Sequence, residues 1–223
     1  QQDITFELVL HLGTFLSVII YFRRRLLALF FSLWQKERQD ERRMILWLIL
    51  ATVPATLAFF SAGDLFERAY DYPVLVGGCL IGTGAILLLP KFFRSEEQEF
   101  GLKQAVWMGV AQALAILPGI SRSGSTITAG LISGGRASRA AEFSFLMFLP
   151  AIGGGVLLKM RDLQAVAQSD AAVAYGFGFA AAFLSGLFAV YLVLRMIRKG
   201  RFEYFAYYCF VVGIVAMIYF GVR

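Results

Sequence analysis

The sequence predicts an all-α integral membrane protein with six transmembrane helices, one re-entrant helical hairpin and an inverted-topology repeat. Three observations lead to this prediction: the composition, the lengths of the apolar runs, and a weak similarity between the two halves of the chain. The chain has 223 residues, of which 59% are hydrophobic and 16% are charged, and its mean hydropathy is +0.69. Soluble domains are about 45–50% apolar and about 25% charged, so this composition indicates a membrane protein.

The charged residues and the cysteines exclude two other classes. The net charge is +6, but Lys and Arg lie in short stretches between apolar runs, as in loops on the cytoplasmic side of a membrane. No nucleic-acid partner is therefore expected. Cys79 and Cys209 each lie inside an apolar run, and we interpret both as packing residues, since two such cysteines form neither a disulfide framework nor a metal site.

Six apolar runs have the length of a transmembrane helix, about 17–25 residues. They are Phe6–Phe22, Met44–Phe60, Pro73–Leu89, Phe143–Leu158, Ala171–Leu194 and Phe202–Phe220. Lipid offers no hydrogen-bonding partner to the backbone, so each run is expected to be helical. In the third run, Gly78 and Gly82 form a small-xxx-small pair that predicts close packing against another helix.

Two further apolar stretches are too short to cross a membrane. Leu102–Leu117 ends in Pro118-Gly119, and Gly124–Ile132 follows a hydroxyl-rich segment. We expect the two stretches to form a re-entrant hairpin. The basic loops agree with this, because residues 23–43, 134–142 and 195–201 all fall on the cytoplasmic side only if the hairpin enters and leaves on one side.

An internal repeat supports the same topology. FELVLHLGTFLSVIIYFRR, from Phe6, matches FSFLMFLPAIGGGVLLKMR, from Phe143, in pattern, and GGCLIGTGAILLL matches YYCFVVGIVAMIY. The predicted spans of each pair run in opposite directions, and inverted repeats place their site near the membrane midplane. We interpret residues 1–223 as a single membrane domain with repeat halves 1–100 and 101–223. The second half begins with a hairpin, so a matching hairpin of about 35–45 residues is expected upstream of Gln1.

The segment LPGISRSGSTITAGL, Leu117–Leu131, places an arginine among hydroxyl groups at the turn of the predicted hairpin. A charge inside a membrane is costly and usually marks a functional site. A guanidinium, hydroxyls and the free N–H groups of a helix start together make a phosphate-binding arrangement. The alternative is a helix cap at this serine cluster, with the Arg122 side chain extending to water.

The motif PGISRSGSTITAGL, followed by GRASRAAEFSFLMFLP, closely resembles the second signature of the bacterial undecaprenyl-pyrophosphate phosphatases, also known as bacitracin-resistance proteins. FELVLHLGTFLSVIIYFRRRL and RRMILWLILATVPA are also similar to that family. The resemblance implies an enzyme that removes the terminal phosphate from undecaprenyl diphosphate and so regenerates the lipid carrier of cell-wall synthesis. The Ser-Arg-Ser and Thr positions of the family correspond to Ser121, Arg122, Ser123 and Thr126.

We therefore predict roles for seven residues around the turn. The catalytic candidates are Ser121, Arg122 and Thr126, and the phosphate-binding candidates are Gly119, Ser123, Gly124 and Ser125. The resemblance also implies a multi-pass protein of the bacterial cytoplasmic (inner) membrane, with its active site facing the outer, periplasmic side. The implied partners are the lipid diphosphate, the membrane and a second copy of the chain.

The family signature near the N-terminus is not found in this sequence. Family members carry two glutamates four residues apart and then a Pro-x-Ser-Ser-Thr-Gly-His segment. The resemblance implies a divalent cation, Mg²⁺ or Ca²⁺, whose carboxylate ligands are expected upstream of this chain, so no metal ligand is assigned within it. His11, the only histidine, is interpreted as a structural or cavity-lining residue, and Arg139 and Glu142 are expected to form a local ion pair.

Two other functions fit the same pattern. Inverted repeats with interrupted helices are common in transporters, so a lipid-phosphate transporter or flippase with a phosphate-binding loop is the main alternative. A non-catalytic binding or scaffold protein is the second. Release of inorganic phosphate separates the phosphatase from both.

Overall fold

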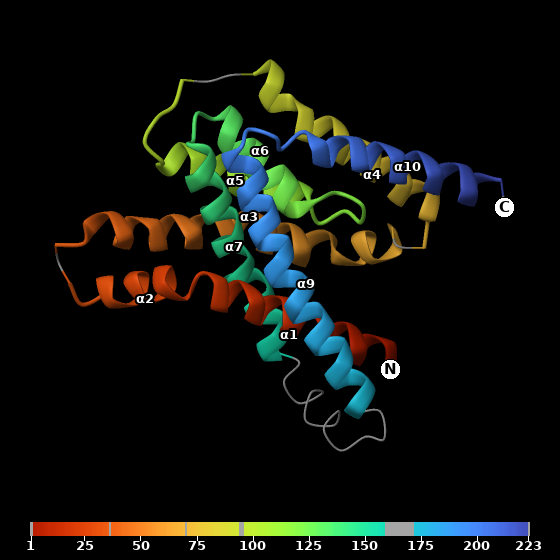
Figure 1. Cartoon of the computed structure of the whole chain (residues 1–223), viewed down its shortest axis with the longest axis horizontal. Coiled ribbons are helices and arrows are strands. Elements are labelled where there is room, and N and C mark those ends of the chain that lie inside the picture. Colours follow the sequence, from red (N-terminus) through yellow and green to blue (C-terminus); the bar gives the residue numbers. More distant parts are fainter. Residues whose placement is uncertain (1, 36, 70, 94–95, 159–171, 223) are drawn as a thin grey trace. The chain divides into compact units, whose positions relative to one another are not determined.

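The computed structural model describes residues 2–35, 37–69, 71–93, 96–158 and 172–222. Within these ranges all the regular elements are helices (Figure 1). The helices are α1 (Gln2–Tyr21), α2 (Arg23–Ser32), α3 (Gln39–Ala69), α4 (Pro73–Phe92), α5 (Leu102–Leu114), α6 (Arg122–Ile132), α7 (Ala137–Leu158), α9 (Ala172–Arg198) and α10 (Tyr204–Gly221). The sequence-predicted all-α class is confirmed.

Among the described residues, four helical segments are long and apolar enough to cross a membrane: Gln39–Ser61 within α3, α4, α9 and α10. A fifth span results if Phe6–Tyr21 and Arg23–Ser32, which meet at a bend of 72°, are counted as one. The chain is thus a multi-pass membrane protein. The fourth predicted run, Phe143–Leu158, lies in α7, and among the described residues α7 does not meet the length and hydropathy criteria for a span.

Most helix ends follow local signals in the sequence. Pro73 is the first residue of α4, where a missing N–H costs nothing because that group has no helical acceptor. Asp40 and Glu41 lie in the first turn of α3 and Arg68 in its last turn, which suits the helix dipole. Helix α3 is longer at both ends than the predicted run Met44–Phe60, because turns with charged residues continue the helix on either side of the apolar run.

The described contacts divide the chain into two compact units. Unit 1 comprises residues 1–45 and 145–195, and unit 2 comprises residues 46–144 and 196–223. In unit 1 the α1 segment runs antiparallel to α7, since the rings of Phe15 and Phe148 lie 6.5 Å apart and those of Phe22 and Phe145 lie 6.0 Å apart.

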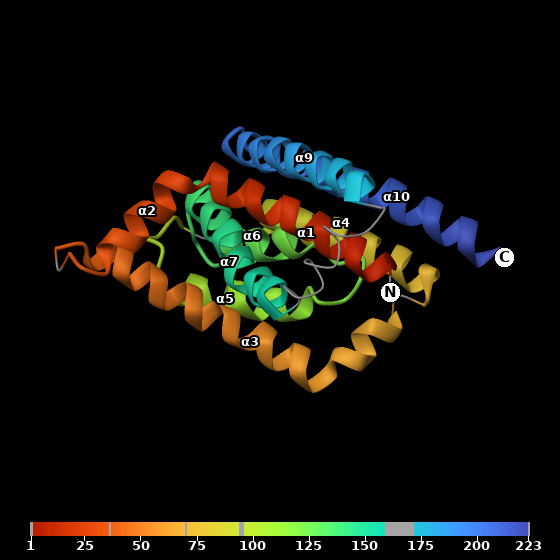
Figure 2. The same cartoon turned by 90° about the horizontal axis from the view of Figure 1, so that it is seen from below.

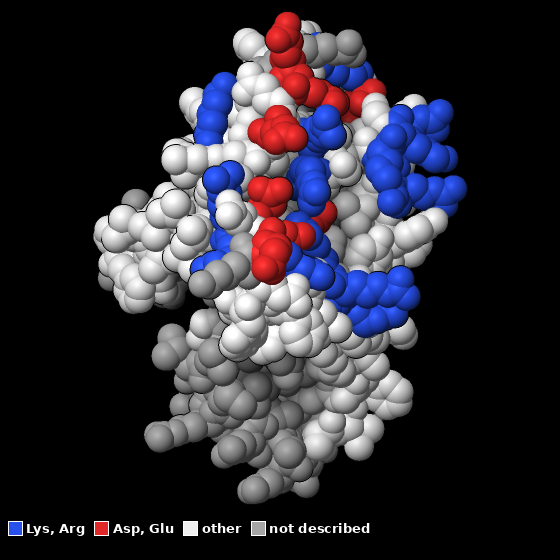
Figure 3. All heavy atoms as spheres, turned by 90° about the vertical axis from the view of Figure 1, so that its left-hand side faces the viewer, with Lys and Arg blue, Asp and Glu red and all other residues white. Residues whose placement is uncertain are grey.

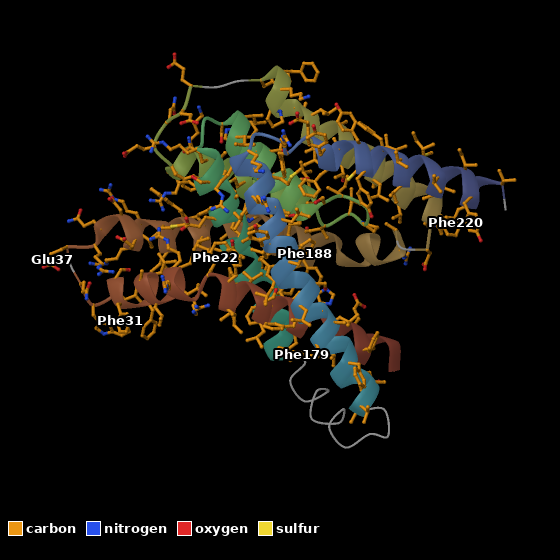
Figure 4. The ribbon with its side chains drawn as sticks, viewed as in Figure 1. Phe22, Phe31, Glu37, Phe179, Phe188 and Phe220 are labelled. Carbon is orange, nitrogen blue, oxygen red and sulfur yellow. The ribbon has the colours of Figure 1, made fainter. Side chains whose placement is uncertain are left out.

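Helix α1 is packed closely against α9 and parallel to it. A Cβ at Gly13 would lie 2.7 Å from the carbonyl oxygen of Phe179, and one at Gly186 would collide with the Ser17 side chain further along both helices. Phe179 and Phe188 are labelled along α9, and Phe22 directly after α1, in Figure 4. Small residues therefore set the approach of these two helices.

In unit 2, α4 and α10 pack closely and antiparallel. A Cβ at Gly77 would lie 2.8 Å from Met217 Cγ, and one at Gly84 would lie 2.8 Å from the Phe210 ring. The prediction that Gly78 and Gly82 form the close helix contact is wrong, because a Cβ at Gly78 would meet no atom within 4 Å and one at Gly82 would meet only Ile120 Cδ1, at 3.7 Å. Adjacent helical residues point about 100° apart, so a shift of one residue selects another face.

Helices α5 and α6 lie side by side and antiparallel in unit 2 (Figures 1 and 2). We call their open end, residues 98–104 with 133–135, the hairpin base. There the Gln98 N–H donates to the Gly134 carbonyl at 2.8 Å, and Gln104 Nε2 donates to the Ser133 carbonyl at 3.1 Å. We call residues 118–126, at the other end, the hairpin turn.

Candidate active site

The second residue of the hairpin turn is a glycine whose replacement would strain the backbone. Gly119 has φ +89°, a backbone conformation that side chains disfavour. A Cβ at this position would also press against the Val76 carbonyl oxygen and lie 2.8 Å from the Cys79 Cβ. The turn therefore rests directly on α4, and Cys79 has the packing role that the sequence predicts.

Ser121 caps the N-terminus of α6. Its extended backbone (φ −70°, ψ 112°) lets its hydroxyl oxygen accept the Gly124 N–H at 3.1 Å, while its carbonyl accepts the Ser125 N–H at 2.8 Å. The cap proposed as the alternative for this cluster is thus present. Among the described hydrogen bonds, none supplies an acceptor for the Ser123 N–H, so one amide of the first turn remains for a ligand.

Thr126 is enclosed in the hairpin, with 1% of its surface exposed. Its hydroxyl donates to the Arg122 carbonyl at 2.9 Å, and its Oγ1 lies 2.6 Å from the Ser144 Oγ on α7. Because a hydroxyl has a single proton, Ser144 is the donor of the second bond when Thr126 donates to Arg122. The Thr126 hydroxyl thereby links the first turn of α6 to α7.

The remaining candidates differ in their access to a ligand. Arg122 and Ser123 are half-buried at the start of α6, whereas Gly124 and Ser125 are buried. A Cβ at Gly124 would lie 2.9 Å from the Ser121 Oγ and 3.2 Å from Leu87 Cδ2, so glycine is required for both the cap and the contact with α4. The buried Ser125 Oγ has no hydrogen-bond partner among the described residues.

Two residues of this neighbourhood were not predicted from the sequence. Thr83, in the middle of α4, donates to the Gly119 carbonyl and accepts the Ser121 N–H, both at 2.9 Å. Ser144, in α7, bonds to Thr126. Each is a hydroxyl residue inside an apolar run, which is a usable signal, but its spacing does not indicate which distant segment it contacts.

His11 makes a local contact in unit 1. Its Nδ1 lies 2.8 Å from the Glu7 carbonyl oxygen, one turn earlier in α1. This bond fits the structural role that the sequence suggested for the only histidine.

Charged side chains pair at the loop ends of the unit 2 helices, and Figure 3 shows acidic side chains lying among basic ones. Lys91 and Glu203 are 3.3 Å apart. A hydrogen bond from its own backbone, together with the Lys91 ammonium, lowers the pKa of Glu203. Arg139 and Glu142 lie 3.7 Å apart, which confirms the predicted ion pair.

A divalent cation is expected from the family resemblance, but the described residues do not provide its ligands. No three His, Cys, Asp or Glu side chains come together in the part of the chain that the structure describes. Hard cations such as Mg²⁺ and Ca²⁺ prefer several oxygen ligands, so the residues around the hairpin turn do not fit a cation by themselves. No step of the reaction below is assigned to a metal ion.

The fold and the turn define a class: a multi-pass helical membrane protein with an arginine and a partly open helix N-terminus at a buried turn. Comparison with known proteins gives the family. Residues 1–215 match a family described as "Bacitracin resistance protein BacA", and the chain belongs to that family.

Three curated relatives of this chain share the name undecaprenyl-diphosphatase. The undecaprenyl-diphosphatase of Salinibacter ruber is 36% identical over 222 residues, which cover 95% of this chain and 82% of the relative. The undecaprenyl-diphosphatase of Syntrophotalea carbinolica is 39% identical over 218 residues, which cover 96% of this chain and 82% of the relative. The undecaprenyl-diphosphatase of Methanobrevibacter smithii is 35% identical, covering 98% of this chain and 84% of the relative.

Proposed function

We propose that this protein hydrolyses undecaprenyl diphosphate to undecaprenyl phosphate and inorganic phosphate. Relatives that share a third or more of their residues over nearly the whole chain are named for this activity. The observation in the chain itself that supports it is Arg122 at the capped start of α6, beside the Ser123 N–H, which has no acceptor among the described hydrogen bonds. These are the groups that bind a phosphate ester or anhydride.

In this proposal Arg122 binds the terminal phosphate. A guanidinium matches two phosphate oxygens and keeps its charge, so it stabilises the negative charge that builds up as the terminal P–O bond to the bridging oxygen breaks. The Ser123 N–H and the Ser123 hydroxyl bind the same group, and Ser121 and Thr126 hold the start of α6 in place. The oxygen of water ends on inorganic phosphate, and the bridging oxygen stays on the lipid phosphate.

We place α5 and α6 in the membrane as a re-entrant hairpin. Contacts along α4 support this: Gly119 packs at Val76, Ser121 bonds to Thr83, and Gly124 packs at Leu87, so α6 runs parallel to α4 and returns along it. The hairpin base brings the start of α5 beside the end of α6. Both arms therefore open toward the same end of α4.

The depth of the hairpin turn follows from its contact with Thr83. Thr83 lies near the middle of α4, Pro73–Phe92, about 15 Å from either end at 1.5 Å per residue. The hydrocarbon core is about 30 Å thick. If α4 crosses the membrane, the hairpin turn lies close to the midplane, where inverted-repeat proteins place their sites.

Six spans with an inverted repeat complete the proposed topology. The paired segments of the repeat run antiparallel within their units: α1 with α7 in unit 1, and α4 with α10 in unit 2. Their directions agree with the alternation of basic loops along the sequence. We assign the protein to the cytoplasmic membrane of a bacterium, with loops 23–43 and 195–201 inside and the active site open to the outer side. A homodimer stays a prediction.

The topology is tested by thiol labelling of intact cells. Cys79 and Cys209 are first replaced by alanine, and single cysteines are then introduced in loops 23–43 and 195–201. An impermeant thiol reagent should label neither loop until the membrane is opened. Labelling from the outside at either loop would contradict the proposed orientation.

The activity is tested with the full-length protein in detergent and in lipid vesicles, with undecaprenyl diphosphate as substrate. Release of one inorganic phosphate per lipid, lost in Arg122→Ala, supports the phosphatase. Movement of labelled lipid across the vesicle wall without release of phosphate would instead indicate the transporter.

A further inference from the structure

We infer that Thr83 is a positioning residue that holds the hairpin turn in the geometry that Arg122 requires, an inference that rests on the proposed phosphatase function. Its hydroxyl is buried, with none of the residue's surface exposed. It donates to the Gly119 carbonyl and accepts the Ser121 N–H, at 2.9 Å in each case. One side chain on α4 therefore joins both sides of the turn that precedes Arg122.

This use of the hydroxyl differs from that of two other helical threonines, Thr52 and Thr126. Thr52 donates to the Leu48 carbonyl at 2.8 Å, and Thr126 donates to the Arg122 carbonyl at 2.9 Å, each four residues back in its own helix. That local bond is the usual one for a threonine in a helix. Thr83 gives its bonds to a segment 36 and 38 residues away instead.

The two backbone groups that Thr83 binds lie outside any helical hydrogen-bond ladder. The Gly119 carbonyl belongs to a residue with positive φ, and the Ser121 N–H belongs to the cap residue of α6. Buried backbone groups of this kind need a partner, because water is not at hand to replace it. By binding one acceptor and one donor, Thr83 sets the orientation of the peptide groups directly before Arg122.

The support for Thr83 is itself tightly packed. The next residue, Gly84, faces the Phe210 ring, and Gly77 faces Met217, so α10 lies close along the back of α4. On the hairpin side, Leu87 contacts Gly124. Thr83 thus lies on a helix that is packed on both sides, which suits it to hold the turn in one position.

The test compares two substitutions at one position. Thr83→Val has nearly the same shape without the hydroxyl, and Thr83→Ser keeps the hydroxyl without the methyl group. Since a misplacement of about 1 Å costs about 100-fold in rate, Thr83→Val should lower kcat by about 10- to 100-fold with a smaller change in KM. Thr83→Ser should recover kcat to within about 3-fold of wild type, because the hydrogen bonds are restored.

Thr52→Val is the matched control, because it removes a threonine hydroxyl of the same unit that bonds only within its own helix. It should leave kcat unchanged. A folded Thr83→Val protein that keeps more than half of the wild-type kcat would overturn the inference. So would a folded Thr83→Ser protein that is as slow as Thr83→Val, since packing of the methyl group would then be responsible.

A second measurement covers the case in which Thr83→Val does not fold. Hydrogen exchange in Thr83→Ala should then be compared with Thr83→Ser, with faster exchange expected in peptides covering residues 119–124 of the alanine variant only. Faster exchange throughout unit 2 would overturn the positioning role. So would an unchanged exchange rate in residues 119–124. If the wild-type protein releases no phosphate, the proposed function fails, and the exchange experiment alone decides the role of Thr83.

Discussion

The two ends of the α5–α6 hairpin are both closed by bonds from side chains to the backbone, but they differ in the cation at the helix start: Arg122 at the hairpin turn is half-buried, whereas Lys103 at the hairpin base is exposed. At the hairpin base, Gln104 uses its whole amide: Oε1 accepts the Gly101 N–H at 2.9 Å, and Nε2 donates to the Ser133 carbonyl. At the hairpin turn, Ser121 caps a single N–H, and the Ser123 N–H has no acceptor among the described hydrogen bonds.

This difference is the basis for proposing that the hairpin turn binds the phosphate and that the hairpin base is structural. A polar residue at a helix start is common, because the first N–H groups need partners. At the hairpin base the bonds to the Gly101 N–H and the Ser133 carbonyl come from an uncharged side chain, Gln104. The hairpin turn combines a cation, Arg122, with an open amide and a glycine, Gly124, that lets the cap form at close range. If this is correct, substitutions at the hairpin turn should reduce turnover, and substitutions at the hairpin base should reduce stability alone.

The largest effect is expected from the arginine of the hairpin turn. Arg122→Ala should lower turnover by about 100- to 1000-fold, or about 3–4 kcal/mol, because a contact to the developing charge is lost. Arg122→Lys should also be severely impaired, since an ammonium cannot bind two oxygens as a fork. Phosphate release and thermal stability are measured together, with Arg139→Ala as the control. More than about a tenth of wild-type turnover in a folded Arg122→Ala would favour the simple cap with a solvated arginine.

The next effect concerns the backbone of the hairpin turn. Gly119→Ala should destabilise the protein by at least about 1–3 kcal/mol from the positive φ alone, and it should slow turnover because the turn is pushed away from α4. The melting temperature and kcat report the two effects. Gly78→Ala is the control: it lies on α4 with open space for a Cβ, so it should be neutral or stabilising. Equal stability of both variants would contradict the geometry described for the turn.

At the hairpin base a substitution should reduce stability and leave catalysis intact. Gln104→Leu leaves the Gly101 N–H and the Ser133 carbonyl without their partner and should cost about 1–3 kcal/mol. The kcat of the folded fraction should stay close to that of wild type. Gln112→Leu is the matched control on the same helix, because its buried Nε2 has no partner among the described residues. A loss of kcat in Gln104→Leu comparable to that in Arg122→Ala would mean that the two ends are not functionally distinct.

Loss of the Thr126 hydroxyl should reduce stability and turnover more than loss of the Ser125 hydroxyl. Thr126→Ala breaks the bond to Ser144 and should cost about 1 kcal/mol, with a measurable loss of turnover. Ser125→Ala should be milder, because the buried Ser125 Oγ has no partner among the described residues. Chemical denaturation and kcat, measured on both variants, check the order. The reverse order would indicate that Ser125 contacts the substrate.

The smallest effect is expected from the ion pair at the end of α4 that lies toward the hairpin base. The lowered pKa of Glu203 means that its contribution to stability is complete above the unfolded value of about 4.3 and is lost as the pH falls through the folded value. Glu203→Gln should therefore flatten the pH dependence of the melting temperature in this acidic range only. Glu99→Gln, on an exposed loop residue, serves as the control. Turnover at neutral pH should not change in either variant.

Local features of the sequence were sufficient for much of the fold. The predicted run Pro73–Leu89 became α4, Pro73–Phe92, and Phe202–Phe220 became α10, Tyr204–Gly221. Composition and run length determine such helices, because the lipid requires about 20 apolar residues. The ion pair of Arg139 with Glu142 also follows from spacing alone, since side chains three residues apart share a helix face.

The candidate site was predictable only in part. The sequence by itself determined that Ser121, Arg122 and Gly124 stand together at a helix start after a Pro-Gly turn, because a cap depends on a few adjacent residues. Only the tertiary structure decided that Thr83 holds this turn, that Ser144 binds Thr126, and that Gly77 rather than Gly78 faces α10. These contacts join segments far apart in the chain, and their geometry depends on how helices are rotated and shifted against one another, which apolar pattern and spacing do not specify.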